Sequence, residues 1–280
     1  MLKRTYIFLL VVLFLGSFVF VKARGILKVS FLDVGQGDAI YIEAPNGNQM
    51  IIDGGPPGSL EAPLSEVMPF GDRSVNLIMI TNPDADHYAG FINLLNDYKV
   101  GAVIVPGTLA GGKTFGDLQK EINYKNIPEV LARRGMTIDI DKENGVTFTI
   151  LFPDRDVSGW TSNDGSIEGI LRYGKNKIMF TGDGTKKTEE VILSENTSEI
   201  LHSDILKVAH HGSATSSEES FISAVAPAWA VISAGYHNKY GLPKQVTLDM
   251  LAKHSAQILR TDELGTVTFI SDGNSYSQAK

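Results

Sequence analysis

The stretch LIMITNPDADHYAG, residues 77–90, carries the strongest information on fold and function in this chain. Four apolar residues lead into a loop that contains Asp84, Asp86 and His87, and an apolar-periodic segment follows from Tyr88 to Tyr98. This order predicts a buried strand, a loop with polar side chains and then a helix. Carboxylate oxygens and imidazole nitrogens bind zinc, manganese or iron, and a short loop can hold several of them around one ion. The loop is equally compatible with a proline turn in which Asp86 caps the helix, so both interpretations stay open.

Other acidic and imidazole side chains follow apolar runs in the same way. Asp53, Asp183 and the pair His210 and His211 each come within three residues of the end of such a run. In α/β architectures, ligands converge at the ends of strands. One aspartate in such a place commonly forms a turn or caps a helix. Four such placements, two of which contain histidine, favour a common site instead.

Composition limits the classes of protein to which the chain can belong. With 280 residues and 43% hydrophobic content, the chain can bury a full-sized core. A net charge of −7 disfavours binding of nucleic acid through a broad basic surface, although a metal site could supply positive charge locally. No cysteine is present, which excludes disulfides, thiolate metal sites and a cysteine nucleophile. No linker or low-complexity stretch divides residues 25–280, so we expect a single domain there.

The first 24 residues differ from the rest. An apolar stretch of sixteen residues, Tyr6 to Val21, lies between the basic pairs Lys3–Arg4 and Lys22–Arg24. It is long for the core of a signal peptide and short for a spanning helix, which needs about 20 residues. Residues 1–24 are therefore predicted to be a signal peptide or an N-terminal membrane anchor. The rest of the chain would be exported to the extracellular or periplasmic side, secreted or held at the membrane.

Short β-rich runs alternate with amphipathic segments over the remainder of the chain. Strands are expected at Leu27–Leu32, Ala39–Glu43, Gln49–Ile52, Asn76–Ile80, Ala102–Val105, Thr147–Leu151, Ile167–Tyr173, Lys177–Thr181, Ile205–Val208, Trp229–Ser233, Gln257–Arg260 and Thr266–Ile270. Helices are expected at Tyr88–Tyr98, Phe115–Tyr124, Pro128–Arg134, Lys186–Ser194, Glu218–Val225 and Val246–His254. The pattern predicts an α/β protein with a mixed sheet system covered by helices.

An ordered set of segments resembles the metallo-β-lactamase-fold hydrolases, and most of all the extracellular metallohydrolase domain of the ComEC DNA-uptake proteins and its stand-alone forms. The segments are FLDVGQGDAI (31–40), IIDGG (51–55), TNPDADHYAG (81–90), NDGS (163–166), FTGD (180–183), LKVAHHGS (206–213), SAGYHNKYGLP (233–243) and RTDELGTV (260–267). The resemblance implies an αββα sandwich, with two facing mixed β-sheets, helices outside and a metal site at one edge. It also implies hydrolysis by water activated at one or two divalent metal ions, Zn²⁺ or Mn²⁺, with DNA or another phosphodiester as substrate.

The resemblance also carries roles onto individual residues of this chain. The residues expected to bind metal are Asp84, Asp86, His87, Asp183 and His210. The residues expected to contact and orient these metal ligands, without binding the metal themselves, are Asp53, Asn82, Asn163 and Asp164. Catalytic roles fall to Asp86, which would orient the water or hold a second ion, and to His211 and Asn238, which would stabilise charge on a phosphoryl oxygen.

Two positions depart from the family's pattern. Asn82 stands where the metal-binding loop usually begins with histidine, and Leu242 stands where a later motif has histidine. Asparagine offers a metal only a neutral carbonyl and leucine offers nothing, which shifts preference toward harder ions. His237 could substitute for the missing imidazole or simply be exposed. A non-catalytic binding domain with a degenerate metal site is therefore the alternative to an enzyme, while β-lactam hydrolysis rests on the name of the fold alone.

Overall fold

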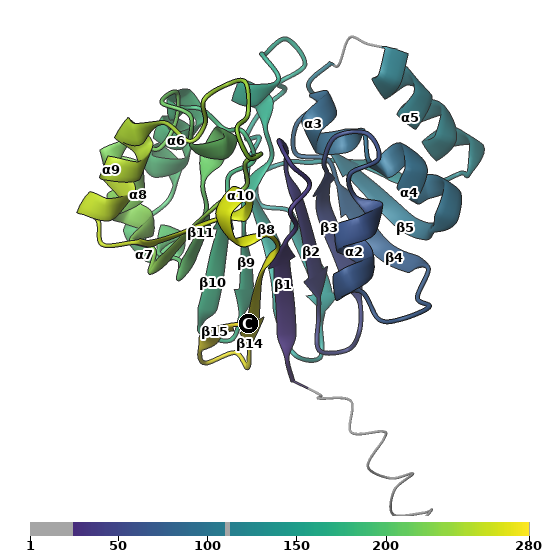
Figure 1. Ribbon diagram of the computed structural model, residues 1–280, viewed down its shortest axis with the longest axis horizontal. Helices are drawn as coiled ribbons and strands as arrows, with labels where there is room; N and C mark the ends of the chain where they lie inside the picture. The colour runs from purple at the N-terminus through teal and green to yellow at the C-terminus, as the bar shows by residue number, and fades with distance from the viewer. Residues whose placement is uncertain (1–24, 110–112, 280) are drawn as a thin grey trace, which may run out of the picture.

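The computed structural model describes residues 25–109 and 113–279, which form two facing β-sheets with helices on both outer faces (Figure 1). This is the predicted αββα sandwich, so the fold class is confirmed. The proposed signal peptide or anchor, residues 1–24, lies outside the described residues. In the part of the chain that is described, no helix is both long and apolar enough to cross a membrane.

The first sheet is mixed. Its eight strands lie in the order β15 (Tyr276–Gln278), β14 (Val267–Ser271), β1 (Leu27–Phe31), β2 (Ala39–Glu43), β3 (Gln49–Gly54), β4 (Ser74–Met79), β5 (Lys99–Val105) and β6 (Glu129–Leu131). Pairing is antiparallel from β15 to β3 and parallel from β3 to β6.

The second sheet repeats this plan. Its seven strands lie in the order β13 (Gln257–Arg260), β12 (Trp229–Ile232), β11 (Ile205–Lys207), β10 (Asn176–Phe180), β9 (Glu168–Tyr173), β8 (Val146–Phe152) and β7 (Thr137–Asp141). Pairing is antiparallel from β7 to β10 and parallel from β10 to β13. Each sheet therefore has a parallel half, and the polar clusters found in the sequence follow strands of these halves.

Helices flank the two sheets on opposite sides of the molecule (Figure 1). Those beside the first sheet are α2 (Glu61–Val67), α3 (Ala85–Tyr88), α4 (Phe91–Asp97) and α5 (Lys113–Tyr124). Those beside the second are α6 (Lys186–Glu195), α7 (Ser198–Leu201), α8 (Glu219–Val225) and α9 (Gln245–Lys253). Short helical turns lie in connections: η1 (Asn163–Gly165), η2 (Ala209–Gly212) and α10 (Thr261–Leu264).

Three apolar cores hold these layers together, one between the sheets and one under each set of helices. Aromatic rings fill the central core, where Phe180 lies 6.2 Å from Phe31 and 5.8 Å from Phe148 between ring centroids. Because the strands next to the helices are covered on both faces, they are continuous apolar runs rather than alternating ones. Ile51 and Ile52 illustrate this, since they pack into different cores.

Some expected elements differ in the structure. The helix expected at 128–134 is wrong, because Glu129–Leu131 pairs with β5 as an exposed edge strand. The helix expected at 88–98 is divided into α3 and α4 around Gly90. At that position a Cβ atom would lie 2.0 Å from the carbonyl oxygen of Gly54, so glycine lets α3 and α4 sit close to β3. Strands β7 and β15 and the helices α2, α7 and α10 were not expected.

Candidate metal centre

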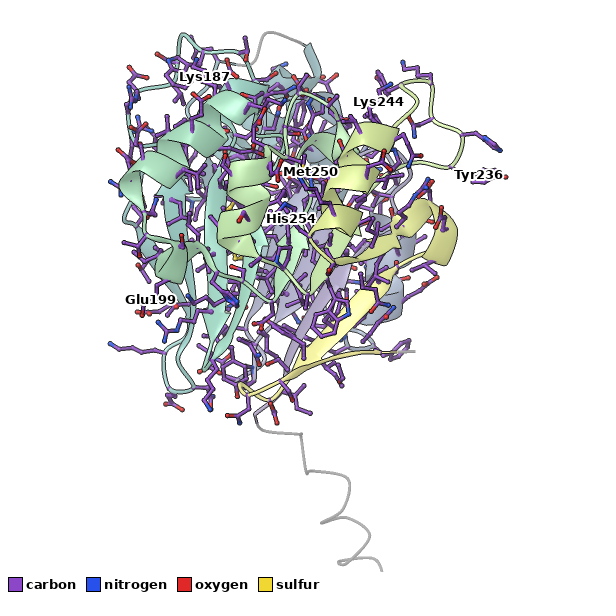
Figure 2. All side chains as sticks on the ribbon, turned by 90° about the vertical axis from the view of Figure 1, so that its left-hand side faces the viewer. Lys187, Glu199, Tyr236, Lys244, Met250 and His254 are labelled. Carbon is purple, nitrogen blue, oxygen red and sulfur yellow. The ribbon has the colours of Figure 1, made fainter. Side chains whose placement is uncertain are left out.

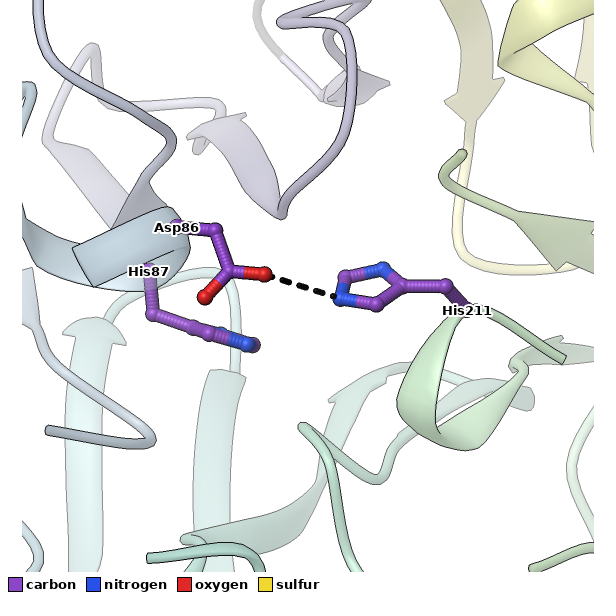
Figure 3. A group of neighbouring side chains, drawn as sticks. All are labelled: Asp86, His87 and His211. Atoms are coloured by element: carbon purple, nitrogen blue, oxygen red, sulfur yellow. Dashed lines mark ion pairs between the residues drawn. The ribbon is translucent and has the colours of Figure 1, made fainter. Parts of the chain in front are cut away.

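Four side chains from three separate parts of the sequence meet at the ends of the parallel strands. Asp86 and His87 project from α3 toward His211 of η2 (Figure 3), and Asp183 follows β10. His87 Nε2 lies 3.2 Å from Asp183 Oδ2. His211 Nε2 lies 3.6 Å from both Asp183 Oδ1 and Asp86 Oδ2. Both sheets therefore contribute to one cluster of two imidazoles and two carboxylates.

The backbone around this cluster adopts conformations that L-residues rarely take. Asp53, His210 and His211 have φ values of 59°, 49° and 53°. Left-handed conformations cost non-glycine residues free energy and are found mostly where the surrounding structure enforces them, often at functional sites. Two consecutive residues of this kind turn the chain sharply after β11 and direct the His211 ring into the cluster.

His87 is fixed from behind by Asp53. Asp53 Oδ2 lies 2.9 Å from His87 Nδ1, and the same carboxylate accepts hydrogen bonds from the backbone N–H and the hydroxyl of Thr81, at 2.7 and 2.6 Å. A carboxylate at Nδ1 makes that nitrogen the donor and leaves Nε2 free as a ligand. His211 is fixed in a comparable way, because its Nδ1 lies 2.9 Å from the carbonyl oxygen of Ser233. Both rings therefore turn Nε2 toward Asp183.

The cluster contains groups that could hold a metal ion: Asp86, His87 and His211 offer ligand atoms close enough to share one ion, and Asp183 and His211 do so together with Asp38. His87 Nε2, His211 Nε2 and Asp183 Oδ1 are buried polar atoms without a hydrogen-bond partner, which is costly unless something else binds them. Ligands at 2.0–2.1 Å from a tetrahedral ion lie about 3.3 Å from one another. The distances of 3.2 and 3.6 Å between these nitrogens and the Asp183 oxygens are close to that spacing. Two nitrogen and two oxygen donors suit zinc or manganese.

The carboxylates of the cluster favour positive charge on the two imidazoles. Burial alone would lower the pKa of His211, but Asp183 and Asp38 outweigh it and raise the pKa to about 10. The pKa of His87 is likewise raised well above its ordinary value by Asp183 and Asp53, against burial. The pKa of the Asp183 carboxyl falls well below its usual range, because the two imidazoles outweigh burial. Protons on both rings thus provide the positive charge that a metal ion would supply.

Two residues expected to bind metal lie at the edge of the cluster. His210 Nδ1 is 3.1 Å from the Thr215 hydroxyl and its Nε2 is 3.9 Å from Asp183 Oδ2. Asp84 is exposed and accepts a hydrogen bond of 2.8 Å from the Ser162 hydroxyl. Neither belongs to the groups of described side chains close enough to share an ion, whereas His211, expected to be catalytic, does.

The remaining expected site residues are engaged in hydrogen bonds beside the cluster. Asn82 is buried. Its amide donates a hydrogen bond of 2.8 Å to Asn163 Oδ1 and accepts a hydrogen bond of 2.8 Å from the backbone N–H of Asp84. Asp164 turns away and accepts from Thr185. The amide of Asn238 is engaged within its own loop, where it donates to the carbonyls of residues 235 and 242 and accepts from the N–H of residue 242.

Asp38 and Lys207 are two residues at the cluster that were not expected from the sequence. Both are buried and form an ion pair, and Asp38 Oδ1 lies 3.5 Å from His211 Nδ1. Lys207 and His211 outweigh the effect of burial and lower the pKa of Asp38 to about 2. Both residues fall within segments that carry the family resemblance, FLDVGQGDAI and LKVAHHGS, which was the available signal.

An open cavity of about 820 Å³ leads to the cluster. Its lining includes Asp86, Asp183, His210 and His211 on one side. The loop of residues 235–243 forms another part of its wall, and Tyr236 points outward from this loop (Figure 2). His237 is exposed in the same loop and belongs to no group of described residues that could hold a metal.

Comparison with known proteins identifies the family of the chain. The model of the metallo-beta-lactamase superfamily matches residues 32–237. The chain is 28% identical over 259 residues to ComE operon protein 3 of Bacillus subtilis, covering 86% of this chain and 33% of that protein. It is also 28% identical over 268 residues to competence protein ComA of Neisseria gonorrhoeae, covering 92% of this chain and 35% of that one. The chain thus spans about a third of the length of these relatives.

A solved structure shares the fold. The metallo-beta-lactamase fold protein YhfI from Bacillus subtilis superposes with a TM-score of 0.57 and 9% identity, covering 90% of this chain and all of that one. The resemblance to a ComEC-like metallohydrolase domain, expected from the ordered segments, is confirmed by the family model and by these relatives.

Proposed function

Because the chain belongs to the metallo-β-lactamase superfamily, we propose that it is a metal-dependent hydrolase of phosphodiesters. The observation that carries the proposal is the pair of buried Nε2 atoms, on His87 and His211, that face Asp183 without hydrogen-bond partners. Zn²⁺ or Mn²⁺, when bound there, lowers the pKa of a coordinated water and polarises a phosphoryl oxygen.

We further propose that the centre holds one ion. The half of the site that begins at Asn82 is occupied by hydrogen bonds: the Asn82 amide bonds to Asn163 and to the loop backbone, and Asp84 Oδ2 accepts from Ser162. The Asn82 amide is neutral and already satisfied, so it adds no negative charge that a second cation would compensate. The proposed ligands are accordingly Asp86, His87, Asp183 and His211.

Residues that face the cavity would act on the substrate. The Asp86 side chain is 34% exposed and reaches both the cluster and the cavity, so its second oxygen can accept a proton from an attacking water. His210 lines the same cavity, and burial lowers the pKa of its imidazole. A neutral imidazole at neutral pH can donate a hydrogen bond to a phosphoryl oxygen without carrying the charge that a metal would repel.

The proposal extends to the substrate and the location of the protein. One relative is named a competence protein, and DNA uptake involves a phosphodiester polymer. We propose DNA or a related phosphodiester as the substrate. The apolar N-terminal segment supports a location on the outer side of the membrane, either anchored or after release as a secreted protein.

Metal content and turnover test the proposal together. We expect purified protein to contain about one equivalent of Zn²⁺ or Mn²⁺ by elemental analysis, and to hydrolyse a chromogenic phosphodiester or single-stranded DNA. Asp86→Ala should lower kcat by at least about 100-fold, because it removes a ligand and a proton acceptor. Asp249→Ala, on the exposed face of α9, is the matched control and should leave kcat unchanged. Protein with no metal and no turnover would refute the proposal, and bound metal without turnover on any phosphodiester would favour a non-catalytic binding domain.

A further inference from the structure

Lys207 is a fully enclosed cation beside the proposed metal centre. It ends β11, and its side chain is 1% exposed. Its ammonium donates a hydrogen bond of 3.0 Å to the carbonyl oxygen of Gly182 and forms an ion pair with Asp38. Lysine is almost never fully buried unless it is paired, so a specific constraint must keep it here.

Asp38 lies behind both imidazoles of the centre. Its Oδ1 is 3.5 Å from Nδ1 of His211, and its Oδ2 is 3.9 Å from Nδ1 of His87. Its backbone N–H also donates to the carbonyl oxygen of Asp86 at 3.2 Å. Carboxylates that contact the far nitrogen of a metal-binding histidine orient the ring and strengthen its binding. Asp38 lies behind both rings, next to the closer contacts that their Nδ1 atoms make with Asp53 and with the carbonyl oxygen of Ser233.

The contacts of Lys207 therefore reach every proposed ligand through one intermediate residue. Gly182 directly precedes Asp183, and Asp38 contacts His87, His211 and the backbone of Asp86. Removing the ammonium would leave the buried Asp38 carboxylate without its closest cation. The carboxylate would then lose the contact that fixes its position, and its displacement would disturb the orientation of both imidazoles.

Stability alone does not explain such a pair. Replacing both members of a buried ion pair by uncharged residues is often neutral or even stabilising, whereas removing one member is costly. A pair kept for stability would therefore gain little over apolar packing at the same place. Its position between Asp183 and the two histidines indicates a different use.

We propose that Lys207 is a positioning residue which, through Asp38 and Gly182, sets the arrangement and hence the affinity of the metal ligands. This inference rests on the proposed function, because it concerns the same metal centre. It extends the functional residues of the site to a lysine that touches neither metal nor substrate.

Paired substitutions separate a positioning role from a structural one. The affinity for Zn²⁺ alone is measured by competition with a chromophoric chelator, and stability by urea unfolding of the metal-free protein. Lys207→Met should lose stability and bind Zn²⁺ roughly 10- to 100-fold more weakly. The double variant Lys207→Met with Asp38→Asn should regain most of the stability, because no buried charge is left alone. Its affinity for Zn²⁺ should nevertheless stay roughly 10- to 100-fold weaker.

The control is Lys253→Met, which removes an exposed lysine paired with Glu219 and should change neither quantity. Recovery of Zn²⁺ affinity together with stability in the double variant would overturn the inference, because the role of Lys207 would then be structural. Unchanged affinity in Lys207→Met would overturn it as well. Failure of the unsubstituted protein to bind Zn²⁺ would instead refute the metal centre itself, which distinguishes the two proposals.

Discussion

Binding of Zn²⁺ to the metal-free protein should release about two protons at pH 6. The pKa of His211 is raised to about 10, four pH units above the experiment, so freeing its Nε2 costs about 5 kcal/mol. The pKa of His87 is also raised well above 6.5. Both rings are therefore protonated in the metal-free protein, and a metal ion must displace one proton from each. A water on zinc, with a pKa near 7, stays protonated at pH 6 and adds little to the count.

Isothermal titration calorimetry in buffers of different ionisation enthalpy measures this number directly. If two protons are released, the affinity for Zn²⁺ should increase by about 100-fold for each unit by which the pH is raised, as long as the pH stays below the pKa values of both rings. His211→Ala should reduce the count to about one, whereas His210→Ala should leave it at about two, because burial lowers the pKa of His210. A count near zero in the unsubstituted protein, or a reduction caused by His210→Ala instead, would refute the assignment of His211 as the ligand.

Three further predictions concern stability. In the metal-free protein, the raised pKa of His211 stabilises the fold fully below about pH 6.5, and this contribution is lost as the pH rises toward about 10. Its melting temperature should therefore fall from pH 7 to pH 10 more steeply than that of a His211→Asn variant, and parallel curves would contradict the assigned pKa. Asn82→Ala should lower the free energy of unfolding, measured in urea, by about 1–3 kcal/mol, because it removes the hydrogen bond to Asn163. Elemental analysis of this variant should still find about one bound metal ion. Loss of the ion would mean that the part of the site around Asn82 also binds metal. Phe148→Ala, at the centre of the core between the sheets, should cost about 3–5 kcal/mol by the same unfolding measurement, and a cost below about 1 kcal/mol would show that the core repacks.

Strands buried on both faces were the most predictable part of the fold. The bounds expected for Ala39–Glu43, for example, are those of β2, which is buried along almost its whole length. The errors fall on elements with weaker patterns: β6 is an edge strand whose three residues are all exposed, and its short apolar pattern fits a helix as well. Because tertiary pairing with β5 determines its conformation, local sequence could not identify it.

The segments that form the candidate site follow from the sequence, whereas the direction of each side chain follows only from the structure. The sequence cannot distinguish His210 from His211, because their left-handed backbone decides which ring enters the cluster. Asp38 precedes a strand rather than following one, so the rule that ligands gather at strand ends did not select it. Lys207 lies inside an apolar run, and from the sequence a lysine is expected to be exposed. Its burial becomes possible through the ion pair with Asp38, which the sequence does not show.

The strained residues connect the fold to the proposed chemistry. Asp53 lies next to the last residue of β3, which pairs in parallel with β4, and His210 with His211 follows β11 of the other sheet; all three are in the left-handed region. Each such residue costs about 1–3 kcal/mol and persists only where surrounding structure enforces it. The sandwich provides that enforcement, because Thr81 anchors the Asp53 carboxylate and Ser233 anchors the His211 ring. Strain of this kind would relax if the two sheets separated, so the geometry of the cluster depends on the packed core between them. The metal ligands can then be held in place without a metal, which lowers the reorganisation that binding requires.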